Sequence, residues 1–292
     1  MADEITLTSH NDTYLAAEVR ASLVQEIRPN NTLRKYMDEV MVSGSNVYQW
    51  PIQADPGAAT AKTEATDRVN TATTTTSAQA TVATVGIMFS PTDEVRSASL
   101  VELVSWTASM AKRSVWEKLE TDLAALLDDG SNATSTAGVD ASVDGLLEAA
   151  SQLVIRDITG RRVFVGSPAQ YTRIQRDMAS SMAIYTGAQA SAAVNFGGDG
   201  RESFVVAGIE CSQTSTAHTA NGAADDVGAV FIPNHTFGLA VANDPIGGGA
   251  WLGRVETQRD ASNNLTEIVC TGRYGGVMVR DGDFQEYLTD DD

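Results

Sequence analysis

The segment of residues 53–79 contains a single large aliphatic residue, Val69, among alanine, threonine and charged residues. A segment of this composition buries too little apolar surface to form a core of its own. Connections of this length inside compact domains are usually functional or disordered. Two interpretations are open: a flexible surface loop, or an arm that gains order on a neighbouring subunit, as added strands do. In both cases the core must come from the sequence on either side of it.

Two segments with strand composition flank this connection. They are residues 46–52 (NVYQWPI) and residues 80–89 (ATVATVGIMF). We expect them to be the two strands of one hairpin. Upstream, residues 12–28 place leucine, valine and isoleucine at helical spacing and end at Pro29, which predicts a short amphipathic helix.

The strongest helix signal lies after the hairpin. Apolar residues recur every three or four positions, at Val101, Val104, Ala108, Ala111, Val115 and Leu119. Ser97 or Ser99 is the expected cap, and Asp128-Asp129-Gly130 the expected end. A second apolar stripe predicts that this long helix is buried on more than one side.

The second half of the chain alternates helices, short strands and turns. We expect helices over residues 143–153 and 168–178, the latter opened by Pro168, with a mobile glycine-rich loop over 179–200. Expected strands are residues 162–166, 204–209, 228–233, 237–241, 252–258, 265–270 and 276–280. The pattern predicts an α+β fold with mostly antiparallel strands.

The charge of the chain restricts its partners. The formal net charge is −18, and the only lysines are Lys35, Lys62, Lys112 and Lys118. Such a chain repels phosphate backbones, so we expect any contact with DNA to be confinement rather than affinity. The acidic start has no apolar segment typical of a signal peptide, and no membrane span is present, which predicts a cytoplasmic location.

The residues that could carry chemistry form no catalytic or metal-binding motif. Two cysteines and three histidines contain neither a CxxC pair nor HExxH, so we expect no metal, no cofactor and no disulfide. A hydrolase could use His235 or His218 with Asp244, but no GxSxG motif supplies a nucleophile. We expect His235 to form hydrogen bonds in a turn, His218 to lie in a solvated loop, and Cys211 and Cys270 to be small buried residues of strands.

The order of the elements resembles a known family. The residues that carry the resemblance are 87–94 (IMFSPTDE), the long helix to Asp128-Asp129-Gly130, residues 162–173 (RVFVGSPAQYTR), and Thr271-Gly272-Arg273-Tyr274-Gly275 followed by residues 277–280. Over nearly its whole length the chain is similar to the major capsid proteins of tailed phages, which have the Hong Kong 97-type fold.

The resemblance implies a division of the chain into parts. Residues 1–43 resemble the N-arm, 44–90 the extended E-loop, and 91–135 the peripheral domain with its spine helix. Residues 136–251 resemble the axial domain, 252–271 further peripheral strands, and 272–292 the axial return strand with an acidic tail. The E-loop would overlap an adjacent subunit, and we expect some of its charged residues, Lys62, Glu64, Asp67 and Arg68, to pair across that boundary.

Some members of the family seal the shell by an isopeptide bond between an E-loop lysine and an asparagine, helped by a glutamate. By resemblance the pair here would be Lys62 and Asn263, but Thr271 stands at the glutamate position. We therefore expect no self-cross-linking. The chain starts at Met1 without room for a fused scaffolding segment, which implies a separate scaffolding protein.

The resemblance implies a structural protein rather than an enzyme. We expect it to assemble in the host cytoplasm, as pentamers and hexamers, into the icosahedral capsid of a virion that encloses double-stranded DNA without binding it specifically. A portal and a cement protein would be further partners. An encapsulin-type compartment shell is the alternative, and a soluble hydrolase the distant one.

Overall fold

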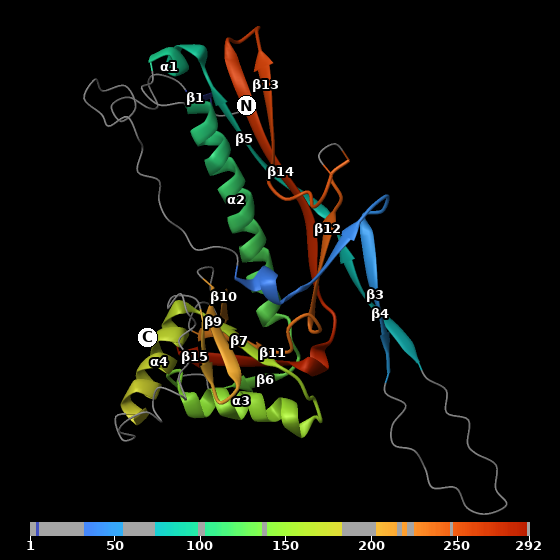
Figure 1. Cartoon of the computed structure of the whole chain (residues 1–292), viewed down its shortest axis with the longest axis vertical. Coiled ribbons are helices and arrows are strands. Elements are labelled where there is room, and N and C mark those ends of the chain that lie inside the picture. Colours follow the sequence, from blue (N-terminus) through green and yellow to red (C-terminus); the bar gives the residue numbers. More distant parts are fainter. Residues whose placement is uncertain are drawn as a thin grey trace, which may run out of the picture.

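The computed structural model describes residues 4–5, 32–54, 74–98, 103–135, 139–182, 203–214, 218–220, 225–245 and 248–290. Within these residues the fold is α+β, with two larger sheets and a separate two-stranded hairpin (Figure 1). The helix expected over residues 12–28 lies outside the described residues. No helix of the described part is long and apolar enough to cross a membrane.

The first sheet has the strand order β1-β5-β14-β12-β2, and β13 also pairs with β14. Its strands are β1 (Glu4–Ile5), β2 (Asp38–Val42), β5 (Ala83–Pro91), β12 (Phe237–Ala242), β13 (Arg254–Asp260) and β14 (Leu265–Met278). The long helix α2 (Leu103–Ala125) lies along one face of this sheet, after the short helix α1 (Asp93–Ala98) and before η2 (Leu126–Asp128). The predicted spine helix is therefore present.

Helix α2 packs one apolar face against the first sheet and, near its C-terminal end, a second side against η1. Its buried apolar side chains include Leu103, Ala111, Val115, Leu119 and Leu123, whereas Ser109 and Lys112 are exposed. The expectation that this helix is buried on more than one side is confirmed for its C-terminal half, where Glu120 and Ala124 are buried as well and Glu120 accepts hydrogen bonds from the chain at η1. A spacing of four residues puts side chains on one helix face, and this face meets the sheet.

Strand β14 runs without a break through residues 271–276, where we expected an interruption. Its alternate residues face α2: the backbone at Gly272 approaches Val115, and Tyr274 donates its hydroxyl to Asp122 Oδ2 at 2.8 Å. Gly276 lies against Leu123 and Leu126. The glycines therefore serve close helix-to-strand packing rather than a turn.

The second sheet has the order β6-β15-β11-β7-β9-β8, with β10 also on β11. Its strands are β6 (Ala133–Ser135), β7 (Arg162–Gly166), β8 (Ser203–Val206), β9 (Ile209–Gln213), β10 (His218–Ala220), β11 (Asp225–Phe231) and β15 (Phe284–Asp290). The strand expected over 204–209 is thus two strands joined by a turn at Ala207-Gly208, both with positive φ. Strand β15 was not among the strands expected from the sequence.

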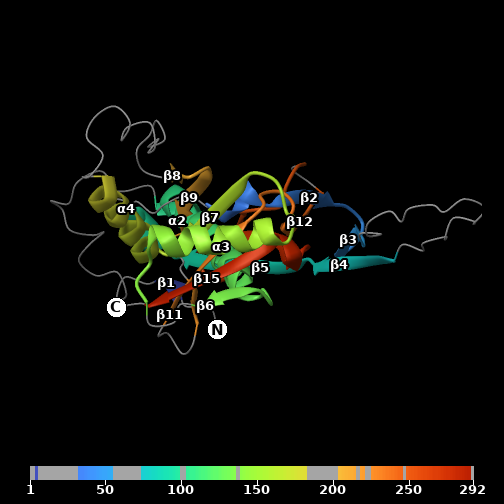
Figure 2. The same cartoon turned by 90° about the horizontal axis from the view of Figure 1, so that it is seen from below.

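Helices α3 (Val143–Ile155) and α4 (Pro168–Met182) accompany the second sheet (Figure 2). Ser142 caps α3 by accepting a hydrogen bond from the backbone N–H of Gly145 at 3.1 Å. Helix α4 extends through residue 182, so the start of the expected loop over 179–200 is helical, while 183–202 lie outside the described residues. Phe164 of β7 belongs to the core formed with these helices.

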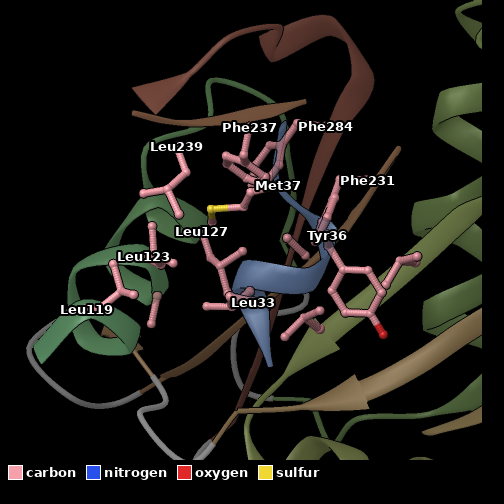
Figure 3. Close-up of a cluster of buried hydrophobic side chains, with 14 of the residues drawn as sticks. Leu33, Tyr36, Met37, Leu119, Leu123, Leu127, Phe231, Phe237, Leu239 and Phe284 are labelled. Atoms are coloured by element: carbon pink, nitrogen blue, oxygen red, sulfur yellow. The ribbon is translucent and has the colours of Figure 1, made fainter. Parts of the chain in front are cut away.

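A second core joins the two sheets (Figure 3). It contains Leu119 and Leu123 from α2, Leu127 from η2, Phe237 and Leu239 from the first sheet, and Phe231 and Phe284 from the second. The short helix η1 (Leu33–Tyr36) inserts Leu33 and Tyr36 between them, followed by Met37. Because interiors of this kind are closely packed, the two sheets hold one relative orientation.

Beside this core, side-chain hydrogen bonds join the loops that connect the two sheets. Asp281 accepts a hydrogen bond from the backbone N–H of Ser131 at 2.9 Å, and Asn132 donates its amide to the carbonyl of Asp281 at 3.0 Å. His235 Nδ1 lies 2.5 Å from Asp283 Oδ2. Side chains thereby link the segments that leave η2, β11 and β14.

Candidate intersubunit interface

The predicted hairpin is present, but one of its strands differs from expectation. Strand β3 (Val47–Gln53) pairs antiparallel with β4 (Thr75–Thr81), from Val47 opposite Thr81 to Gln53 opposite Thr75. The expected partner, residues 80–89, mainly forms β5, which pairs with β14 in the first sheet. The threonine-rich segment becomes a strand because β-branched side chains fit a pleated surface even when they are polar.

This hairpin projects away from both sheets (Figures 1 and 2). Among the residues of its two strands only Trp50 and Ala80, both near the base, are buried. A two-stranded hairpin without a sheet or helix behind it is marginally stable in water. The described residues of its outer half are thus held only by their pairing with one another.

Trp50 fixes the base of the hairpin to the first sheet. Its side chain is 7% exposed and packs in a small core with Val42, Ala80, Val82, Ala240 and Ala242. The indole Nε1 donates a hydrogen bond to Asp38 Oδ2 on β2 at 2.9 Å. Tyr48 packs edge-on against the indole, with ring centroids 4.6 Å apart. The anchor thus combines apolar burial with a satisfied polar atom.

Two glycines allow the base to approach the sheet closely. A Cβ atom at Gly238 of β12 would lie 2.5 to 2.9 Å from three ring atoms of Trp50. A Cβ atom at Gly275 of β14 would lie 2.3 Å from the carbonyl oxygen of Thr81. Both distances are shorter than a van der Waals contact, so the hairpin rests on surfaces that only glycine provides.

A polar cluster lies beside the same base. Arg273 donates Nη2 to Asn46 Oδ1 at 2.8 Å, and its guanidinium lies 5.3 Å from the ring centroid of Trp251. Arg254 lies 5.4 Å from the same ring and pairs with Asp244 at 2.9 Å. Trp251 donates Nε1 to Thr271 Oγ1 at 3.0 Å. The base of the hairpin is therefore held against the first sheet by polar contacts as well as by apolar packing.

The residues predicted from sequence to make the intersubunit contacts, Lys62, Glu64, Asp67 and Arg68, lie outside the described residues. Asn263 lies in the exposed turn between β13 and β14, and its amide donates to Asp260 Oδ2 at 2.9 Å. Hydrogen bonds from Ser262 and Asn263 lower the pKa of Asp260. Thr271 bonds to Trp251 as described. The relation of Lys62 to Asn263 therefore stays a prediction.

Two residues of the hydrolase alternative, His235 and Asp244, pair with other side chains. His235 lies in a turn and pairs with Asp283, as expected of a turn residue, while Asp244 pairs with Arg254. His218 begins strand β10 rather than lying in a loop. Cys211 and Cys270 are buried in strands as predicted, and burial raises the pKa of the Cys211 thiol to about 12. Thiols with raised pKa values are poor nucleophiles.

No group of three or more metal-binding side chains occurs among the described residues. The anchor of Trp50, Asp38 and Gly238 was not predicted from the sequence. The strand composition of residues 46–52 was recognised, but no local signal pairs a tryptophan with a glycine so distant in sequence. The anchor depends on the parallel pairing of β2 with β12, which brings Asp38 beside Gly238.

Comparison with known proteins agrees with this architecture. The model of the phage capsid family matches residues 13–195. Comparison with curated protein sequences finds no match.

Solved structures of similar fold cover nearly the whole chain. A structure of Mycobacterium phage Che8 matches with a TM-score of 0.70 and 17% identity, covering 92% of this chain and 94% of the other. The capsid structure of cyanophage P-SCSP1u matches with a TM-score of 0.68 and 14% identity, covering 91% and 90%. The SrpI encapsulin of Synechococcus elongatus matches with a TM-score of 0.65 and 11% identity, covering 91% of each chain.

Proposed function

The chain belongs to the phage capsid family, and from this premise we propose that it assembles through its projecting hairpin into pentamers and hexamers of an icosahedral head. It is a structural protein of the capsid shell. The observation that carries the proposal is the hairpin, which buries two residues of its strands and projects away from both sheets. An exposed hairpin of this kind is marginally stable by itself and would be stabilised by burial against a second copy of the chain.

The division of the chain that the resemblance implied is proposed on the same basis. The first sheet with α2 corresponds to the peripheral domain, and the second sheet with α3 and α4 to the axial domain. Strand β14 passes unbroken through residue 271, and the core around Leu33, Leu127 and Phe237 is shared. We therefore propose two domains that move together as one body.

Charged contacts between subunits are the second part of the proposal. We propose that Lys62, Glu64, Asp67 and Arg68 pair with a neighbouring copy, each exposed pair contributing roughly 0–1 kcal/mol. Cross-linking of Lys62 to Asn263 is not proposed, because a threonine stands where the resemblance requires a glutamate. Mass spectrometry of denatured particles tests this, since a covalent link would give species heavier than the monomer.

The proposed partners follow from the function. They are copies of this chain, a separate scaffolding protein, a portal, a cement protein and enclosed double-stranded DNA, with assembly in the host cytoplasm. The net charge of −18 supports enclosure without specific binding, because an acidic surface releases no DNA counterions. Micromolar binding of free duplex DNA at physiological salt in a mobility-shift assay would contradict this part.

Assembly of the purified protein tests the function directly. We expect capsomers or shells of several hundred kilodaltons or more in sedimentation velocity, and closed particles in negative-stain micrographs. A stable monomer at high concentration contradicts the proposal. The alternative, an encapsulin-type compartment, would be supported if particles purified from their natural source contained a protein cargo in place of DNA.

A further inference from the structure

We propose that Trp50 is a positioning residue for assembly: by resting on Gly238 and donating to Asp38, it sets the direction in which the hairpin leaves the first sheet. This inference rests on the proposed function, because the direction matters only if the hairpin contacts a second copy of this chain. The partner is therefore that second copy.

The contacts of Trp50 define the direction at the base of the hairpin. The indole is bounded below by the backbone of Gly238 and laterally by the hydrogen bond of 2.9 Å to Asp38. Val40, Val42 and Ala240 line the same small core. Because β2 and β12 are paired strands, Asp38 and Gly238 move as one surface, and the indole is held against both.

The other strand of the hairpin is held at its own base. The carbonyl of Thr81 lies directly over Gly275, and Val82 donates its backbone N–H to the carbonyl of Asn46 at 2.7 Å. Each strand thus has one glycine beneath it, on neighbouring strands β12 and β14. Two points of support fix a direction, whereas one would leave the hairpin free to pivot.

Beyond these supports the hairpin is held by its own pairing. From Pro51 and Ala78 outward the described residues are exposed or partly exposed, and the last backbone bond described joins Ala54 N–H to the carbonyl of Thr74 at 2.9 Å. A small rotation at Trp50 is therefore amplified along the hairpin. Its base sets where the hairpin meets the next subunit.

The substitution Gly238→Ala tests this inference. The added methyl group would lie 2.5 to 2.9 Å from the indole, which the bond to Asp38 holds, so the indole and its strand must shift. We expect the concentration needed for assembly to rise about tenfold, or the particles to change size. Gly282→Ala is the matched control, because a Cβ atom there meets nothing within 4 Å.

Two further variants separate displacement of the hairpin from loss of folding. Trp50→Phe removes the ring atoms that the new methyl group would meet, so Gly238→Ala combined with Trp50→Phe should assemble better than Gly238→Ala alone. Circular dichroism and urea unfolding of each variant report folding. If Gly238→Ala misfolds, Trp50→Phe alone, which adds no atoms to the core, must still alter particle size or the assembly concentration.

The outcomes distinguish this inference from the proposed function. If the parent protein does not assemble, the proposed function fails and the inference fails with it. If the parent assembles and Gly238→Ala, folded, assembles like Gly282→Ala, the inference alone is wrong. An altered particle with an unchanged unfolding midpoint supports it.

Discussion

Glu286 of β15 and Asp128 of η2 bring two carboxyl groups into hydrogen-bond contact at the junction of the two sheets. Burial, together with the charge of Asp128 and its hydrogen bond, raises the pKa of Glu286 to about 7. Two adjacent carboxyl groups avoid charge repulsion and can share a hydrogen bond when one of them is protonated. Loss of the proton from Glu286 at high pH should therefore weaken the packing of the two sheets at this junction.

We expect Glu286→Gln to stabilise the protein at alkaline pH. Between the unfolded pKa, 4.5, and the folded pKa, about 7, the native state holds a proton that the unfolded state has lost. The free energy of unfolding of the parent should therefore fall as pH rises through this range. Urea unfolding at pH 8 should show the variant more stable by about 1 kcal/mol.

The control for this prediction is Glu148→Gln, which removes an exposed carboxyl group of α3. Its unfolding free energy should follow the pH dependence of the parent. If Glu286→Gln and the parent show the same slope between pH 5 and pH 8, the carboxyl pair does not control stability.

Glu120 of helix α2 binds the backbone at the start of η1, beside the junction of the two sheets. Its Oε1 accepts hydrogen bonds from the backbone N–H groups of Thr32 and Leu33 at 3.1 and 3.2 Å, and from the hydroxyl of Thr214 at 2.9 Å. The buried Oε2 has no hydrogen-bond partner among the residues that the structure describes. Burial raises the pKa of Glu120 despite these bonds.

We expect Glu120→Ala to destabilise the protein by about 1–3 kcal/mol, because it leaves buried donors without an acceptor. Glu120→Gln should cost less, since its amide oxygen can occupy the position of Oε1. Urea unfolding of the two variants at pH 7 measures the difference. Equal losses would mean that packing of the side chain, rather than the acceptor, holds η1.

The spine and strand β7 could be predicted from sequence because their signals are local. A spacing of four from Ala111 through Val115 to Leu119 matches one helix face. Pro168 correctly marked the start of α4. The first strand of the hairpin was predicted correctly, but its pairing with residues 80–89 was wrong, because the true partner β4 has no large aliphatic residue to mark it as a strand.

Strand β15 could not be predicted because its polar residues are buried by distant partners. Gln285 donates its amide to Thr134 Oγ1 at 2.7 Å, and Glu286 shares the carboxyl pair with Asp128. Tyr287 donates its hydroxyl to the carbonyl of Ser142 at 3.4 Å. These partners lie far away in sequence, and the apolar residues Phe284, Tyr287 and Leu288 do not alternate with polar ones as in a half-buried strand. Tertiary contacts override such local signals.

The charge of the chain gives a prediction about salt. Subunits with a net charge of −18 repel one another over a Debye length that falls from about 30 Å at 0.01 M to about 10 Å at 0.1 M ionic strength. We expect light scattering to show stronger assembly as NaCl rises through this range. Particles that dissociate instead would show that ion pairs between subunits outweigh the overall repulsion.

The last prediction concerns the segment at the tip of the hairpin. Replacing residues 55–73 by a short Gly-Ser turn joins Ala54 to Thr74, whose backbones are already hydrogen-bonded at 2.9 Å, so β3 and β4 should stay paired. We expect a native-like circular dichroism spectrum and loss of assembly in sedimentation velocity, because the segment has one large aliphatic residue and adds little to its own subunit. Lys62→Ala and Arg68→Ala are the matched controls, and each should have a mild effect. Full-size particles from the shortened protein would show that the segment is a passive surface loop.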